Sequence, residues 1–225
     1  MKITHVLFDM DGLLLDTESV YTIVTTKILE RYGKQFTWDL KSTMMGQKER
    51  DAAEFLISQT QIPLTVDEYL KERSEGHAKL FPHCKPLPGV LKLITHLKHH
   101  QIPIAVATSS HQKAFDIKTE NNQHLFQLFD GNVIVGDHPS IKNGKPSPDI
   151  FQQAAKLIGN SNPETCLVFE DAVSGVQAGL NAGMHVVWVP DVRMELDSAL
   201  VDRCCEVLKS MEDFDPTRYG LPSYV

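Results

Sequence analysis

The chain has 225 residues, 42% of them hydrophobic, which suits one globular domain with room for a small inserted unit. Its formal net charge of −7 disfavours nucleic acid or an anionic membrane as a partner. The sequence has no apolar run of membrane-spanning length, no signal-peptide pattern at its start, and four cysteines without CxxC spacing. We therefore expect a cytoplasmic protein with reduced thiols, a monomer, that acts on a small molecule.

The first predicted element is a short apolar strand over 3–8, which ends at Asp9-Met10-Asp11-Gly12. The pattern then turns helical, and we expect helices over about 16–32, 48–58 and 66–81. No convincing strand pattern occurs in this part of the chain. The sequence Pro86-Leu87-Pro88-Gly89 then marks a turn.

Beyond this turn, strands and helices alternate. Strands are expected over 103–108, 133–135, 166–170 and 185–189, and helices over 90–99, 111–121, 148–158 and 172–182. Such alternation predicts an α/β fold whose parallel sheet is covered by helices on both faces. Because the first strand belongs to the same sheet, we assign 1–15 and 86–225 to a catalytic core and 16–85 to an inserted all-helical cap.

Polar residues collect where the predicted strands end. Asp9 and Asp11 follow the first strand, Thr108-Ser109-Ser110 follow the second, and Glu170-Asp171 end a later one. Ligands of open parallel sheets bind outside the carboxyl ends of the strands. We therefore expect these side chains to meet at one edge of the sheet, where they could act together.

The two aspartates have a plain interpretation and a chemical one. Asp and Gly are common in turns, so Asp9 and Asp11 could simply cap or turn the chain. Alternatively, Asp9 is placed to attack phosphorus, since carboxylates form phosphoryl-enzymes. Asp11, two residues on, would donate a proton to the leaving oxygen and later take one from water, which requires a raised pKa.

Two further segments could hold a phosphate group. Thr108-Ser109-Ser110 could cap the helix that follows, and a helix N-terminus with hydroxyl groups is also a phosphate site. Lys145 lies in Gly144-Lys145-Pro146-Ser147-Pro148-Asp149. A loop lysine is ordinarily solvated, but two prolines stiffen this loop, which could hold the ammonium near Asp9 and a phosphoryl oxygen.

A cation is expected beside the acidic residues. Glu170 and Asp171 could cap the next helix, yet together with Asp9 and Asp11 they would crowd one sheet edge. Two unit charges ~4 Å apart repel by roughly 4 kcal/mol near a protein surface. Magnesium fits such a site because it prefers carboxylate oxygens, water and substrate phosphate, whereas calcium fits a phosphate site less well.

Four segments together resemble the motifs of the haloacid dehalogenase superfamily. They are Asp9 to Thr17, Thr108-Ser109-Ser110, Gly144-Lys145-Pro146 and Phe169-Glu170-Asp171. The resemblance implies a Rossmann-like core with a helical cap, an aspartyl-phosphate at Asp9, and Mg2+. It also implies metal ligands at Asp9, the backbone carbonyl of Asp11, Asp171, and Glu170 directly or through water. Thr108, the Ser109 backbone N–H and Lys145 would hold the transferring phosphoryl group.

Further segments, among them Arg31-Tyr32-Gly33-Lys34 and Phe115-Asp116-Ile117-Lys118-Thr119, resemble family members that act on pseudouridine 5'-phosphate. The expected function is thus a magnesium-dependent phosphatase of that ester, a role in nucleotide metabolism, with Gly46 in the substrate site. Glycerol-phosphate and sugar-phosphate phosphatases are alternatives. A sugar phosphomutase fits less well, because Glu49 stands where such mutases carry arginine. A non-catalytic binding protein would not need every one of these residue types.

Overall fold

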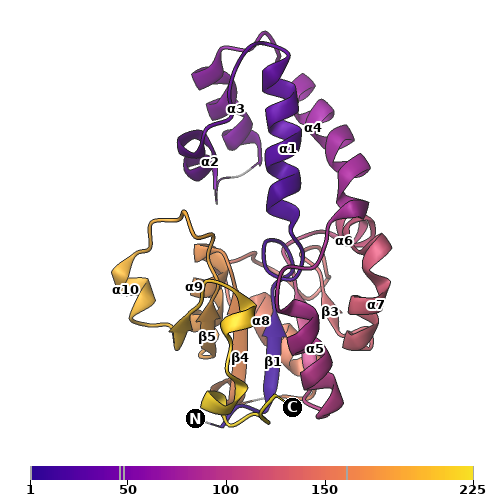
Figure 1. The fold of residues 1–225 in the computed structure, drawn as a ribbon, viewed down its shortest axis with the longest axis vertical. Helices are drawn as coiled ribbons and strands as arrows, with labels where there is room; N and C mark the ends of the chain where they lie inside the picture. The colour runs from indigo at the N-terminus through magenta and orange to yellow at the C-terminus, as the bar shows by residue number, and fades with distance from the viewer. Residues whose placement is uncertain (1, 46, 48, 161, 225) are drawn as a thin grey trace. The chain divides into compact units, whose positions relative to one another are not determined.

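The structure is a computed structural model that describes residues 2–45, 47, 49–160 and 162–224. Its chain divides into two compact units (Figure 1). The core unit comprises Met1–Asp16 and Lys85–Val225, and the helical unit comprises Thr17–Cys84. Among the described residues, every helix is too short or too polar to cross a lipid bilayer.

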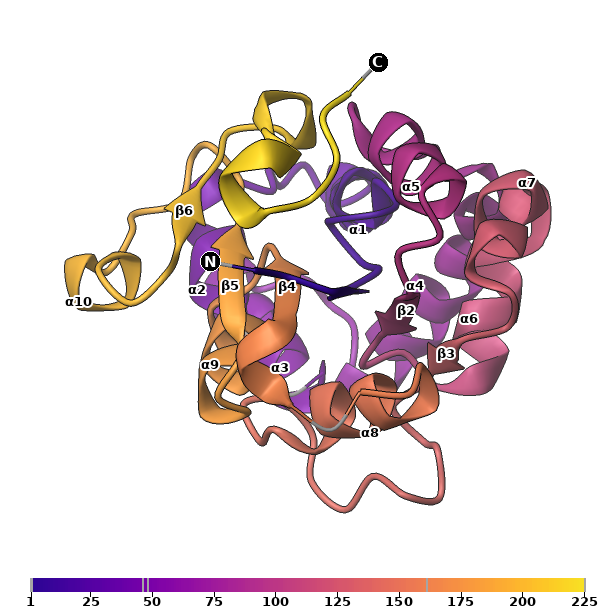
Figure 2. The same ribbon diagram turned by 90° about the horizontal axis from the view of Figure 1, so that it is seen from below.

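The core unit contains a six-stranded sheet in which every neighbouring pair is parallel. Its strands are β1 (His5–Phe8), β2 (Ile104–Ala107), β3 (Val133–Ile134), β4 (Cys166–Glu170), β5 (His185–Trp188) and β6 (Glu206–Val207). Their order across the sheet is β3-β2-β1-β4-β5-β6, with β1 near the centre (Figure 2). This confirms the predicted α/β fold and adds β6, whose two residues are too short to give a pattern.

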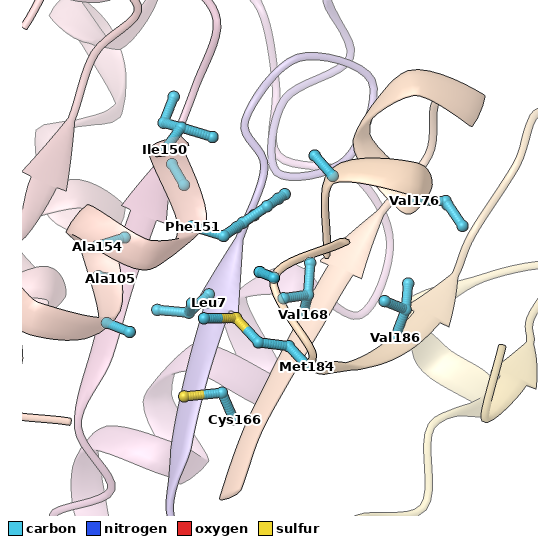
Figure 3. Close-up of a cluster of buried hydrophobic side chains, with 14 of the residues drawn as sticks. Leu7, Ala105, Ile150, Phe151, Ala154, Cys166, Val168, Val176, Met184 and Val186 are labelled. Atoms are coloured by element: carbon cyan, nitrogen blue, oxygen red, sulfur yellow. The ribbon is translucent and has the colours of Figure 1, made fainter. Parts of the chain in front are cut away.

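Helices flank this sheet on both faces. They are α5 (Val90–His99), α6 (Gln112–Thr119), α7 (Gln123–Phe126), α8 (Asp149–Leu157), α9 (Val173–Asn181) and α10 (Ser198–Val201). Leu7, Val168 and Val186 project from the strands into one apolar cluster with Phe151 of α8 and Val176 of α9 (Figure 3). Burying each such large side chain contributes about 1.5–3 kcal/mol.

Alternate residues of the same strands pack on the opposite face, as the two-residue period of a strand requires. The rings of Phe8 in β1 and Phe169 in β4 stack with centroids 5.0 Å apart. Phe129 and Phe214 add edge-to-face contacts to these two rings. Both faces of the sheet are thus apolar, which explains why its strands appear in the sequence as continuous hydrophobic runs.

The helical unit contains α1 (Thr17–Glu30), α2 (Trp38–Met44), α3 (Glu49–Thr60) and α4 (Val66–Leu80). Thr65 and Glu68 form a reciprocal capping box that fixes the start of α4. Tyr69 is fully buried, and its hydroxyl lies 3.4 Å from that of Thr25 in α1. The sequence pattern did not predict α2, which is short and buries Lys41 rather than an apolar stripe.

Candidate active site

The register of the sheet brings three strand ends together. Phe8, the last residue of β1, pairs with Val106 of β2 and Phe169 of β4. Asp9 continues the ladder, because its backbone N–H donates to the Phe169 carbonyl at 3.1 Å. The residues that follow these strands therefore share one edge of the sheet, the place where parallel sheets bind ligands.

Lys145 is the centre of the first group of polar residues at this edge. Its ammonium donates hydrogen bonds to Asp9 Oδ1, to Glu170 Oε1 at 2.6 Å and to the Ala107 carbonyl at 3.1 Å. The side chains of Lys145, Asp9 and Glu170 are only 6%, 8% and 1% exposed. One buried ammonium thus serves two buried carboxylates, which leaves an excess of negative charge.

The surroundings of this group fix its geometry. Glu170 Oε2 accepts hydrogen bonds from the backbone N–H groups of Asp171 and Ala172, at 3.0 and 3.1 Å. Gly175 in α9 leaves room for this carboxylate, since a Cβ there would lie 1.7 Å from Glu170 Oε1. The Lys145 ammonium also lies 5.0 Å from the centre of the Phe151 ring, a cation–π contact.

The electrostatics of the group follow from this burial. Desolvation, with the nearby charges of Glu170 and Asp11, raises the pKa of Asp9 to about 7, although Lys145 opposes the shift. Burial alone would lower the pKa of Lys145, but the charges of Asp9 and Glu170 outweigh it and raise that pKa. Lys145 is therefore a fixed cation, whereas ionised Asp9 needs further positive charge.

A metal ion could supply that charge. Asp9, Glu170 and Asp171 each present a carboxylate oxygen, and the three oxygens lie within 4.8 Å of one another. An all-oxygen donor set suits a hard divalent cation such as Mg2+. The Asp171 backbone carbonyl also accepts a 2.7 Å hydrogen bond from Trp188 Nε1 in β5, which anchors this part of the cluster. The residues therefore fit the magnesium expected from the sequence.

Asp11 is held by a second group of polar residues. Its Oδ2 accepts hydrogen bonds from the hydroxyls of Ser110, at 2.8 Å, and Thr108, at 3.3 Å. Its Oδ1 accepts one from Lys118 of α6 at 2.5 Å. Thr108 Oγ1 in turn accepts from the Ser110 backbone N–H at 3.0 Å. The structure thus brings Asp11 and Thr108 together, as the sequence predicted.

The loop after β2 differs from one expectation. Residues Thr108-Ser109-Ser110 were candidates for a helix cap, but α6 is capped by His111, whose Nδ1 accepts from the Ala114 backbone N–H. The Ser109 carbonyl instead packs against Gly136, where a Cβ would lie 2.3 Å away. Residues Thr108-Ser109-Ser110 therefore do not cap α6, and they are held at the sheet edge by their contacts with Asp11 and Gly136.

A similar correction applies after β4, where α9 begins at Val173 with Ala172 as its cap. Glu170 is not the cap of this helix, because its carboxylate accepts hydrogen bonds from the backbone N–H groups of Asp171 and Ala172, which precede α9. The predicted substrate residue Gly46 lies outside the described residues. The structure therefore gives no place for it.

Sequence reasoning gave no individual role to Lys118, Gly175 or Trp188, and it considered Ser110 only as part of the segment Thr108-Ser109-Ser110. Lysine is rarely buried, so nothing in a single sequence distinguishes Lys118 from a solvated helix residue. Gly175 and Trp188 depend on packing between elements that only the fold brings together.

Known proteins resemble this chain in sequence and in fold. Residues 6–189 match the family described as haloacid dehalogenase-like hydrolase. The chain belongs to this family. A protein of Arabidopsis thaliana named (DL)-glycerol-3-phosphatase 1, mitochondrial, is 46% identical over 99% of this chain and 75% of its own length. A Drosophila melanogaster protein named as a probable pseudouridine-5'-phosphatase is 39% identical over 99% of this chain and 96% of its own.

A solved structure of this haloacid dehalogenase-like family has the same fold. The hydrolase from Deinococcus radiodurans R1, determined with bound phosphate and sodium, has a TM-score of 0.83 over 99% of each chain, at 23% sequence identity. The family match and the relatives above show that this haloacid dehalogenase-like protein is an enzyme of the phosphatase class.

Proposed function

We propose that the protein is a magnesium-dependent phosphatase of a small phosphomonoester, and that Asp9 carries the phosphoryl group as an aspartyl-phosphate. The observation that supports this most is the placement of Asp9. It is a buried carboxylate at a strand end, bonded to Lys145 and within 4.8 Å of carboxylate oxygens of Glu170 and Asp171. Burying a carboxylate so close to like charges costs free energy unless a cation or a proton offsets its charge.

In the first step, Asp9 attacks phosphorus and the bond from phosphorus to the leaving oxygen breaks. Lys145 holds Asp9 in place and neutralises charge on a phosphoryl oxygen. Thr108, which directly follows β2, and the Ser109 backbone N–H would contact the remaining oxygens. Asp9, Asp171 and Glu170 would hold Mg2+, with the Asp11 backbone carbonyl, and the ion would supply positive charge to the phosphoryl group.

Asp11 handles the protons in this scheme. It gives a proton to the departing alkoxide oxygen, so that the product leaves as an alcohol. It then takes a proton from the water that attacks phosphorus and breaks the bond to Asp9. The side chain lies on the same loop as the nucleophile and is 23% exposed, which allows contact with both a leaving group and water.

The identity of the alcohol has two candidates. Pseudouridine 5'-phosphate is supported by the resemblance in the sequence and by the Drosophila relative at 39% identity. Glycerol phosphate is supported by the two Arabidopsis relatives named as glycerol-3-phosphatases, at 46% and 44% identity. A sugar phosphomutase is disfavoured by Glu49, which is acidic and forms an ion pair with Arg73 inside the helical unit.

The test is phosphate release with and without Mg2+ from pseudouridine 5'-phosphate, uridine 5'-phosphate, both glycerol phosphates and hexose phosphates. We expect release that needs Mg2+ and stops in Asp9→Asn, with circular dichroism and melting showing an intact fold. Near-wild-type release by Asp9→Asn, in protein free of host phosphatase, would refute Asp9 as the nucleophile. Isomer formation without free phosphate would instead establish a mutase.

A further inference from the structure

Lys118 is a buried lysine that the chemistry above does not use. It lies near the end of α6, and its side chain is only 3% exposed. Its ammonium donates to Asp11 Oδ1 at 2.5 Å and to Ser110 Oγ at 2.9 Å. A buried ammonium is costly unless it is paired and hydrogen-bonded, so these contacts hold the lysine where it is.

The three side chains form a closed triangle. Ser110 Oγ donates to Asp11 Oδ2 at 2.8 Å, so each of Asp11, Ser110 and Lys118 contacts the other two. Lys118 holds one carboxylate oxygen of Asp11, and Ser110, together with the Thr108 hydroxyl at 3.3 Å, holds the other. Because an aspartate side chain has only two torsions, contacts on both oxygens fix the position and the plane of its carboxyl group.

We infer that Lys118 is a positioning residue for Asp11, and that through Asp11 it controls the departure of the leaving group. The inference rests on the proposed function, in which Asp11 gives its proton to the leaving oxygen. A positioned acid needs its proton within hydrogen-bond reach of that oxygen, and displacements of about 1 Å can cost roughly 100-fold in rate. Without Lys118, the Asp11 carboxyl group loses the contact on Oδ1 that helps to fix its plane.

This role predicts a dependence on the leaving group. An alkyl ester leaves as an alkoxide, a strong base that must be protonated as the P–O bond breaks. The leaving groups of acetyl phosphate and p-nitrophenyl phosphate, acetate and p-nitrophenolate, are weak bases that depart without a proton. Loss of Lys118 should therefore slow cleavage of the alkyl ester far more than cleavage of either of these activated substrates. A lysine that only supports the fold would slow both equally.

The experiment measures kcat/KM, which reports the steps up to leaving-group departure, for two substrates. One is the best alkyl ester from the panel above, and the other is acetyl phosphate or p-nitrophenyl phosphate, whichever the wild-type protein cleaves faster. The variants are Lys118→Met, Ser110→Ala and Asp11→Asn. Thr119→Val is the matched control, because it alters a buried neighbour on α6 whose hydroxyl donates to the Phe115 carbonyl, away from Asp11.

We expect Lys118→Met to lower the ratio of alkyl to activated kcat/KM at least tenfold. Asp11→Asn should lower the ratio by at least as much, and adding Lys118→Met to it should lower the ratio no further. Ser110→Ala should lower the ratio in the same direction, and it keeps the inference testable if Lys118→Met does not fold. Thr119→Val should leave the ratio unchanged.

Two failures can be told apart. If Asp11→Asn lowers the ratio but neither Lys118→Met nor Ser110→Ala does, the positioning inference is wrong and the proposed function stands. If Asp11→Asn itself leaves the ratio unchanged, Asp11 is not the acid, and the proposed proton transfer fails together with the inference.

Discussion

Gly175 offers a test of how tightly the fold defines the site. The residue lies in α9, far from the reacting atoms in sequence, yet a Cβ at this position would lie 1.7 Å from Glu170 Oε1. Real Cβ contacts do not fall below 3.0 Å, so Gly175→Ala must displace the Glu170 carboxylate by about 1.3 Å. Glu170 is 1% exposed, and it has little free space to enter.

The size of the effect follows from the contacts that this displacement breaks. Glu170 would lose its 2.6 Å bond to Lys145 or its 3.0 and 3.1 Å bonds to backbone N–H groups. A hydrogen bond to a charged group contributes about 1.5–3 kcal/mol, while alanine gains about 1 kcal/mol in helix propensity. The net loss in the free energy of unfolding is then about 0.5–2 kcal/mol if the Lys145 bond breaks and about 2–5 kcal/mol if both backbone bonds break.

Urea unfolding measures that loss, and phosphate release measures its effect on activity. A displacement of this size among the groups around Asp9 should reduce kcat/KM roughly 100-fold. Gly144→Ala is the matched control, since nothing lies within 4 Å of its Cβ position, and it should change the free energy of unfolding by less than about 1 kcal/mol. A Gly175→Ala protein with wild-type stability and activity would refute the reasoning.

Three other predictions concern the same cluster. Trp188→Phe removes the donor to the Asp171 carbonyl, so half-maximal activity should need severalfold more Mg2+; an unchanged magnesium titration would contradict this. Lys145→Met leaves Asp9 and Glu170 without their shared ammonium and should cost about 3–5 kcal/mol in urea unfolding; a loss below about 1 kcal/mol would contradict this. Folding raises the pKa of Asp9 from 3.8 to about 7, so in EDTA the stability this group provides is full below about pH 4 and lost as the pH rises through about 7. Unfolding free energies of the wild type and Asp9→Asn should therefore diverge over that range, in favour of the variant.

The sequence predicted the sheet well because its central strands are buried on both faces. Such strands must be apolar along their whole length, and the runs around Leu7 and Val168 show this directly. The polar residues that end these runs stood out for the same reason. Elements without a continuous apolar signal were missed, such as the two residues Glu206–Val207 of β6 and the helix Trp38–Met44.

The candidate site was predictable only where a residue type is unusual for its position. Asp9 and Glu170 end apolar strands, so their carboxylates demanded an explanation, and the structure places both against Lys145. Lys118 gave no such signal, because a lysine on a helix is ordinarily solvated and only the fold reveals its burial against Asp11. Gly175 is likewise an ordinary helix residue until the Glu170 carboxylate is seen beside it.

The central claim is that the Asp9 carboxylate accepts the phosphoryl group. Beryllium fluoride mimics a phosphoryl group attached to a carboxylate, so a crystal grown with it and Mg2+ tests the claim directly. We predict density for a beryllium fluoride group whose beryllium is bonded to an Asp9 carboxylate oxygen, with Lys145 and Thr108 beside it. An ordered site that holds this group on any other residue, or that leaves the Asp9 carboxylate unmodified, would contradict the account.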